Sequence, residues 1–142
     1  MRKLVVLLAV TGALAVAAAS LAATRGTGWS ATLTAAQEIP KQAVKTPAAH
    51  GSFTATVSGA TLKWKLTFSK LSGPATAAHI HLGATGKAGN VLVALCGPCK
   101  SGASGSAPLT GALKAKYAKH LLYVNVHTAK NPAGEIRGQI GG

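Results

Sequence analysis

Acidic residues are almost missing from this chain of 142 residues. Lysine and arginine total 15, the only acids are Glu38 and Glu135, and the formal net charge is +13. The absence of aspartate excludes Ser-His-Asp triads, EF-hand calcium loops and aspartate metal ligands. Hydrolysis by paired carboxylates would need Glu38 beside Glu135, and nothing in the local sequence links them. These absences favour a protein that binds a partner over an enzyme.

Aromatic residues are also few, at 4% of the chain, and the lysines are scattered. Proteins that stack nucleic-acid bases need aromatic side chains within a basic groove, so we do not expect nucleic acid as a partner. A surface of this charge attracts other polyanions, such as an anionic polymer or a membrane surface. An unidentified envelope or extracellular macromolecule is an equally open partner, and the plainer interpretation of the charge is solubility.

Long apolar runs are missing except at the start of the chain, which reads "MRKLVVLLAVTGALAVAAASLAA". The basic start, apolar run and small-residue end predict a secretory signal peptide over residues 1–22, cleaved after Ala19 or Ala22. A retained membrane anchor is the alternative. We therefore expect residues 23–142 to form one exported domain, periplasmic or secreted, that does not cross a membrane after cleavage.

Apolar and polar residues alternate in short segments along the rest of the chain, as in "TLKWKLTF" at 61–68. This period of two predicts β-strands that bury one face, and Gly- or Pro-containing turns separate them. The expected strands are 29–35, 51–58, 61–68, 77–83, 91–96, 121–128 and 134–140. The pattern predicts an all-β fold, an antiparallel Greek-key-like β-sandwich of about seven to eight strands with its core over residues 30–141.

Three other segments have distinct patterns. Residues 91–96, "VLVALC", are apolar throughout, which predicts a strand buried on both faces. Residues 37–50 and 101–111 are rich in turn-forming residues and are expected to be loops. Residues 112–120 are the only helical candidate.

The stretch Cys96-Gly97-Pro98-Cys99 matches the active-site loop of thioredoxins in sequence. A thioredoxin loop opens a helix that lowers the pKa of the first thiol, whereas a Gly- and Ser-rich segment follows here. We therefore predict a local structural disulfide between Cys96 and Cys99 in an exported protein. A minor redox role and a thiolate pair for Cu(I) or Zn are the alternatives.

Histidines occupy the polar faces of two expected strands. His79 and His81 lie opposite Ile80 and Leu82, and His127 shares a face with Tyr123 and Asn125. If these strands are neighbours, the three imidazoles converge on a candidate Cu or Zn site with an open position. The alternative is that they bond to backbone groups on a polar surface. His50 and His120 are expected to be solvated in loops.

Glu135 and Arg137 share the polar face of the last expected strand. They can pair with each other, Arg137 can pair with Glu38, or Arg137 can face solvent or a bound anion. Together with Tyr123 and Asn125, these residues are expected to form a structural or binding face.

Three stretches together resemble the CHRD, or chordin-type, domain: "AAQEIP" with Glu38 and Pro40, "HIH" at 79–81, and "YVNVHT" followed by "GEIRGQI" up to residue 140. The resemblance implies a single exported β-sandwich module with no established general enzymatic activity. Growth-factor binding is not implied, because the Cys-rich modules of chordin are missing from this chain.

"HIHLG" also resembles the H-x-H strand of copper–zinc superoxide dismutases, which places His79, His81 and His127 at positions like those of copper ligands. The chain has neither an aspartate for a zinc subsite nor a His-rich loop after this strand. The sequence thus predicts a non-enzymatic binding module of unidentified partner. The alternative is an envelope protein that binds Cu or Zn through three histidines, dismutase-like in geometry only.

Overall fold

The computed structural model describes residues 28–142, so the predicted signal peptide at 1–22 lies outside the described residues. Eight β-strands supply most of the regular structure of this part of the chain. They are β1 (Gly28–Thr34), β2 (His50–Ser58), β3 (Thr61–Ser69), β4 (Ala75–Leu82), β5 (Val91–Cys96), β6 (Ala103–Pro108), β7 (Leu122–Thr128) and β8 (Ile136–Gln139). A short 3-10 helix, η1 (Ala35–Gln37), follows β1, and one α-helix, α1 (Gly111–Ala118), lies between β6 and β7.

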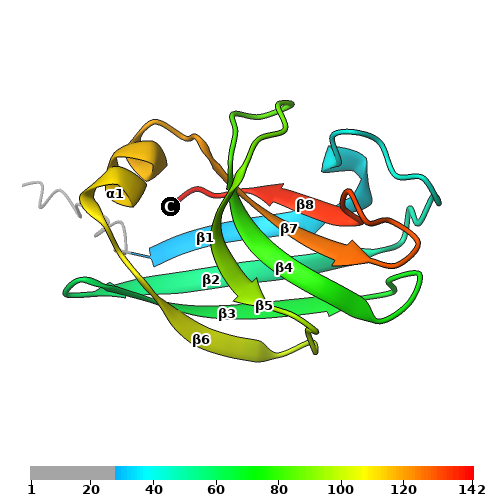
Figure 1. Cartoon of the computed structure of the whole chain (residues 1–142), viewed down its shortest axis with the longest axis horizontal. Helices are drawn as coiled ribbons and strands as arrows, with labels where there is room; N and C mark the ends of the chain where they lie inside the picture. The colour runs from blue at the N-terminus through cyan, green and yellow to red at the C-terminus, as the bar shows by residue number, and fades with distance from the viewer. Residues whose placement is uncertain (1–27) are drawn as a thin grey trace, which may run out of the picture.

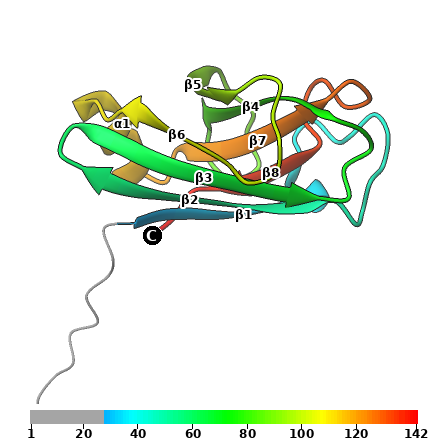
Figure 2. The same cartoon turned by 90° about the horizontal axis from the view of Figure 1, so that it is seen from below.

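The strands form one antiparallel sheet in the order β5-β4-β7-β8-β1-β2-β3-β6, which folds over itself into two layers (Figure 1). Figure 2 shows β1, β2 and β3 in one layer and β4, β5 and β7 in the other. The layers are joined where Thr34 of β1 pairs with Arg137 of β8. Strands β8 and β1, and likewise β4 and β7, are neighbours in the sheet although they are not consecutive in the chain, as in Greek-key-like sandwiches. The predicted all-β, Greek-key-like sandwich is confirmed.

An apolar core fills the space between the two layers. Trp29, Phe53 and Leu66 enter it from one layer, and Ile80 and Val124 enter it from the other. Each of these residues alternates with a polar neighbour along its strand, so a single face of each strand supplies the core. Burial of such side chains is the main stabilising term for a domain of this size.

The outer faces of the two layers differ in exposure. On the first layer, Thr54, Thr56, Lys63 and Lys65 point outward and are exposed to solvent. On the second layer, all seven residues of β7 are buried, including those whose side chains point away from the core. Chain segments that connect the strands cover this second outer face, and a polar interior lies beneath them.

Strand β5 corrects the expectation that residues 91–96 are buried on both faces. It lies at one end of the sheet and pairs only with β4, and its residues Val91 and Leu92 are 49% and 38% exposed. An apolar run therefore marks an edge strand here, not a central one.

Strand β6 corrects the expectation that residues 101–111 are a loop. Ala103–Pro108 pairs with β3 at the other end of the sheet. A Cβ on Gly105 would lie 2.7 Å from a ring carbon of Trp64, so glycine fits this strand because the indole packs on its backbone. Because glycine has low strand propensity, the need for glycine at this position makes the strand hard to recognise in the sequence.

The helix expected over 112–120 is present as α1. Thr110 caps it, since its hydroxyl accepts a hydrogen bond from the backbone N–H of Leu113 at 3.1 Å. Tyr117 of α1 stacks on Trp29 of β1 with ring centroids 4.2 Å apart, which fixes the helix against the start of the sheet.

The two ends of the described chain lie together. Ser30 and Gly141 form an antiparallel bridge, with Ser30 N–H donating to Gly141 O at 2.7 Å and Gly141 N–H donating to Ser30 O at 2.8 Å. The last residues thus extend the pairing of β1 beyond the point where β8 ends.

Candidate metal site

The structure brings His79, His81 and His127 together on the outer face of β4 and β7. These strands are neighbours, with Ala77 opposite His127 and His79 opposite Asn125. One ligand nitrogen from each of the three histidines lies within 4.8 Å of the other two. Metal–nitrogen bonds of 2.0–2.1 Å imply nitrogen separations of roughly 3.3 to 3.6 Å around a shared ion. Small rotations of the rings would therefore bring the three nitrogens onto one ion.

Backbone carbonyls orient two of the three rings. Nδ1–H of His81 donates to Gly89 O at 3.0 Å, and Nδ1–H of His127 donates to Pro132 O at 3.0 Å. A carbonyl oxygen only accepts, so each of these rings carries its proton on Nδ1 and keeps a lone pair on Nε2. A carbonyl holding the far nitrogen of a ring in this way is the usual support of a metal-ligating histidine.

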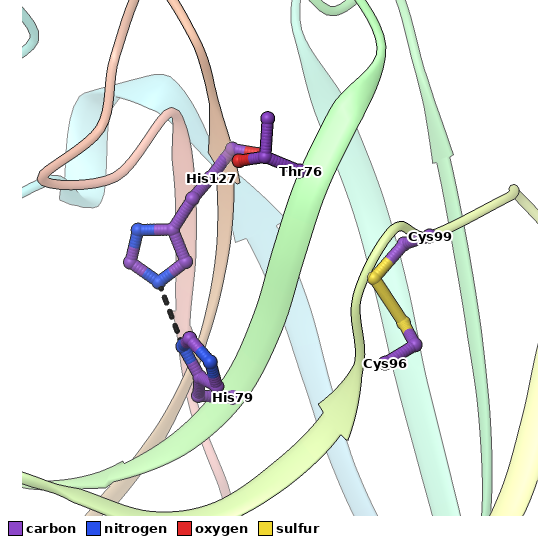
Figure 3. Close-up of a disulfide and its surroundings, with 5 residues drawn as sticks. All are labelled: Thr76, His79, Cys96, Cys99 and His127. Atoms are coloured by element: carbon purple, nitrogen blue, oxygen red, sulfur yellow. Dashed lines mark hydrogen bonds between the residues drawn. A yellow bond between two sulfur atoms is a disulfide. The ribbon is translucent and has the colours of Figure 1, made fainter.

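The third ring, that of His79, contacts the ligand nitrogen of His127 directly. Nδ1–H of His79 donates to Nε2 of His127 at 3.1 Å, and Figure 3 shows the two rings pointing toward one another. A metal ion can replace this shared proton once His79 carries its proton on Nε2 instead. His79 is half-buried, whereas His81 and His127 are each 8% exposed, so the cluster opens to solvent at His79.

Nε2 of His81 is a buried nitrogen without a hydrogen-bond partner. Such groups are uncommon, because a buried polar atom that leaves water without a new partner costs free energy. The ring that carries this nitrogen belongs to the same cluster as His79 and His127. The site therefore holds a lone pair that no protein group uses.

Burial keeps all three imidazoles neutral at physiological pH. Desolvation lowers the pKa of His79, and it lowers the pKa of His81 with further lowering by the charges of His79 and Arg137. Burial and the neighbouring His79 lower the pKa of His127 to about 4. Neutral imidazole is the form that ligates metals, so protons compete weakly for this site.

Tyr123 and Arg137 stack behind His81. The rings of His81 and Tyr123 are nearly parallel, with centroids 4.9 Å apart, and the Arg137 guanidinium lies 3.5 Å from the centroid of the Tyr123 ring. Arg137 donates through Nη2 to the carbonyl oxygens of Ala84 and Lys87, at 3.1 and 2.8 Å. Those carbonyls belong to the segment between β4 and β5 that also supplies Gly89 O. One loop thus holds both His81 and the stack behind it.

Glu38 is fully buried near this face. Its Oε2 accepts a hydrogen bond from Nδ2 of Asn125 at 3.2 Å. Burial raises the pKa of Glu38 to about 7, against the opposing effects of the Asn125 hydrogen bond and the Arg137 charge. The hydrogen bonds of Arg137 go to backbone carbonyls. The direct ion pairs of Arg137 with Glu135 or Glu38, which the sequence left open, are therefore not among its hydrogen bonds.

Glu135 is fully buried and fixes a turn instead of joining the histidines. Its carboxylate accepts hydrogen bonds from the hydroxyls of Ser72 and Thr128 and from Nδ2 of Asn131. Burial opposes ionisation of Glu135, but these donors outweigh it and lower the pKa. Its carboxylate joins the 69–75 connection to the β7–β8 turn, which carries the Pro132 carbonyl that orients His127.

Cys96 and Cys99 form a disulfide with their Cα atoms 5.3 Å apart. Strand β6 follows Cys99, without the helix that a thioredoxin loop opens. Cys99 belongs to the apolar core, while the histidines lie on the outer face of β4, and Figure 3 shows the disulfide apart from the facing rings of His79 and His127. The bonded cysteines offer no thiolate to a metal.

Fold and site together define the class of this protein: an all-β sandwich domain that carries a histidine cluster under loops on one outer face. The chain belongs to the CHRD domain family, since the family model for the CHRD domain matches residues 29–140. CHRD domains are non-catalytic binding domains that occur in extracellular proteins. A search of curated proteins and a search of solved structures each found no match. Among residues 28–142, no helix is long and apolar enough to span a membrane.

The sequence identified the three histidines but not the groups that orient them. The carbonyls of Gly89 and Pro132 leave no side-chain signal, because any residue type can supply a carbonyl. One trace is present, since a Cβ on Gly89 would lie 1.7 Å from Leu82 O, a contact that only glycine avoids. The exposed His50 is the first residue of β2, not part of a loop as expected, and the exposed His120 follows α1.

Proposed function

We propose that this protein is an exported, non-enzymatic CHRD-domain module that binds a transition-metal ion, Cu or Zn, through His79, His81 and His127. The observation that carries the proposal is the buried, unpartnered Nε2 of His81, a residue that offers a ligand nitrogen within 4.8 Å of ligand nitrogens of His79 and His127. Coordination would give this atom the partner that the protein does not provide. The signal-like start of the sequence and the family's occurrence in extracellular proteins support export.

The support of the site favours a metal over a purely structural role. Two rings are oriented by carbonyls at 3.0 Å, and burial keeps the imidazoles in the ligating form. A set of three nitrogens with an opening at His79 leaves a coordination position for water or for a group of another molecule. Such a site suits uptake, storage or transfer of the ion.

Elemental analysis of the purified, untagged mature protein, followed by titration with Cu and Zn, tests the proposal. We expect about one ion per chain by the donor count, and its loss in the double variant His79→Ala/His127→Ala. The matched control is His50→Ala/His120→Asn, which changes two exposed histidines outside the cluster. Asn at position 120 tolerates the positive φ of 55° found there.

A wild-type protein that binds no ion, or a double variant that folds and keeps its ion, would overturn the metal proposal. Folding of each variant is checked by far-ultraviolet circular dichroism and thermal unfolding.

The outer face of the first layer supports a second candidate, binding of an anionic polymer or surface. Lys63 and Lys65 project from β3 among exposed hydroxyl side chains such as Thr54, Thr56 and Ser104, and the whole chain carries +13. A flat basic face of this kind attracts polyanions through long-range electrostatics that salt screens. This face and the histidine cluster lie on opposite layers, so a macromolecule and a metal ion would not compete.

A further inference from the structure

The donor set around the three histidines is electrically neutral. Glu38 and Glu135 are the only acids of the sequence, and their hydrogen bonds go to Asn125 and to Ser72, Thr128 and Asn131. Cys96 and Cys99 are bonded to each other. An ion at this site therefore meets three neutral nitrogens and no anionic ligand, and it keeps its full charge inside a partly buried site.

A fixed positive charge lies behind this donor set. Arg137 stacks on Tyr123, which stacks on His81, so the guanidinium is one aromatic ring away from the cluster. Its hydrogen bonds go to two neutral carbonyl oxygens, so no anionic group pairs with the guanidinium through them. The acid whose charge acts on Arg137 is Glu38, which is fully buried and has a pKa raised to about 7, so it is only partly ionised at neutral pH.

Charge and ligand number both bear on the choice of ion. A positive field and a neutral donor set disfavour a doubly charged ion more than a singly charged one, because the Coulomb energy scales with the charge of the ion. Zn(II) in proteins takes four ligands, so at three histidines it depends on a water molecule or another molecule for its fourth ligand. Three neutral imidazole nitrogens suffice for a monovalent copper ion, which accepts low coordination numbers.

We propose that the three-histidine cluster selects Cu(I) over divalent ions, and that the Arg137 guanidinium stacked behind His81 sets this preference. The inference rests on the proposed metal-binding function and names its cargo. The open side at His79 is where the ion would enter and leave. Arg137 touches no ligand atom of the cluster, so it acts as a positioning residue and a source of charge.

Competition titrations of the mature protein test the preference. Cu(I), kept reduced by ascorbate without oxygen, is titrated against bicinchoninate, and Zn(II) is titrated against a chromophoric zinc chelator. We expect Cu(I) to bind at least a hundredfold more tightly than Zn(II), by charge and ligand number. Equal or tighter binding of Zn(II) would overturn the Cu(I) assignment while leaving the metal-binding function in place. Binding of neither ion would remove both.

A matched pair of variants isolates the role of charge. Arg137→Lys keeps the positive charge and Arg137→Gln removes it, and both lose the planar stack on Tyr123. We expect the copper midpoint potential of Arg137→Gln to lie about 59 mV below that of Arg137→Lys, which is a tenfold change in the ratio of Cu(I) to Cu(II) affinity. Equal potentials in the two variants would show that Arg137 does not set the preference. If either variant does not fold, the wild-type affinity ratio alone decides the proposal.

Discussion

Several buried side chains beneath the loops of the second layer are polar, which is unusual for a β-sandwich. Glu38, Asn125 and Arg137 are all buried, and each has a polar atom without a hydrogen-bond partner. Polar groups of this kind make a domain less stable than an apolar filling of the same volume would. Their presence on the outer face of the second layer is consistent with the binding role proposed for that face.

Glu38 makes the stability of the domain depend on pH. Its pKa is about 7 in the folded protein and 4.5 when unperturbed, so the folded state holds the proton more tightly. Its contribution is fully present below pH 4.5 and is lost as the pH rises through 7. The charged groups acting on it are Arg137, which lowers this pKa, and Glu135, which raises it.

The variant Glu38→Gln should remove this dependence. We expect the free energy of unfolding of the wild type to fall between pH 4.5 and 7, by at most about 3 kcal/mol, relative to that of the variant. Urea titrations of both proteins at half-unit pH steps measure the difference. Parallel curves for the two proteins would mean that the Glu38 carboxyl titrates normally.

At the level of elements, the segment between β4 and β5 supports the proposed metal site. It donates no side chain to the cluster, yet its carbonyls bind Nδ1–H of His81 and the guanidinium of Arg137. Gly89 holds the loop against β4, because its backbone passes close to Leu82 O and Leu82 N–H donates to Asn90 O at 2.9 Å.

Gly89→Ala should therefore weaken metal binding without altering a ligand. We expect at least a tenfold loss of copper affinity, because the displaced carbonyl no longer orients His81, a typical cost of removing such support. Gly86→Ala is not a neutral control, since Gly86 has a φ of 74°, so Ala88→Gly in the same loop serves as the control. Unchanged affinity in Gly89→Ala would show that the loop merely covers the site.

The elements differ in how far the sequence predicted them. Strands β3, β4 and β7 followed from strict alternation, because one face of each is apolar and the other polar. Strand β6 did not, because Gly105 and the serines around it have low strand propensity, and its pairing with β3, with Trp64 close against the glycine, makes this segment a strand. The exposure of β5 could not be predicted, because edge position depends on strand order.

The same distinction holds for the candidate site. Alternation placed His79 and His81 on one face, and the neighbouring position of β4 and β7 then brought His127 to them. Burial of this face was not predictable, because polar residues such as Asn125 and Arg137 usually indicate a solvated surface. The connecting segments that cover the face contribute backbone groups, which carry no sequence signal.

At the scale of the whole molecule, the two proposed binding properties belong to different outer faces. The face of β1, β2, β3 and β6 is exposed, with hydroxyl side chains and lysines, while that of β4, β7 and β8 is buried and polar. We assign the proposed polyanion binding to the first face, where we expect it to depend on net charge as much as on any single contact.

Heparin serves as the polyanion probe for this face. We expect retention on a heparin column that decreases steeply with salt, and elution of Lys63→Ala/Lys65→Ala at clearly lower salt than the wild type. The control is Lys114→Ala/Lys119→Ala, which removes the same charge from exposed positions at α1. Equal shifts in the two double variants would mean that only net charge matters and that β3 forms no specific face.

The pairing of Ser30 with Gly141 has a consequence for how this domain can be combined with others. Polypeptide that continues from Gly28 and polypeptide that continues from Gly142 leave the sandwich at neighbouring points. A host protein could therefore carry the whole domain as an insertion within one of its surface loops. The two points at which the host chain is interrupted and resumes would then lie close together.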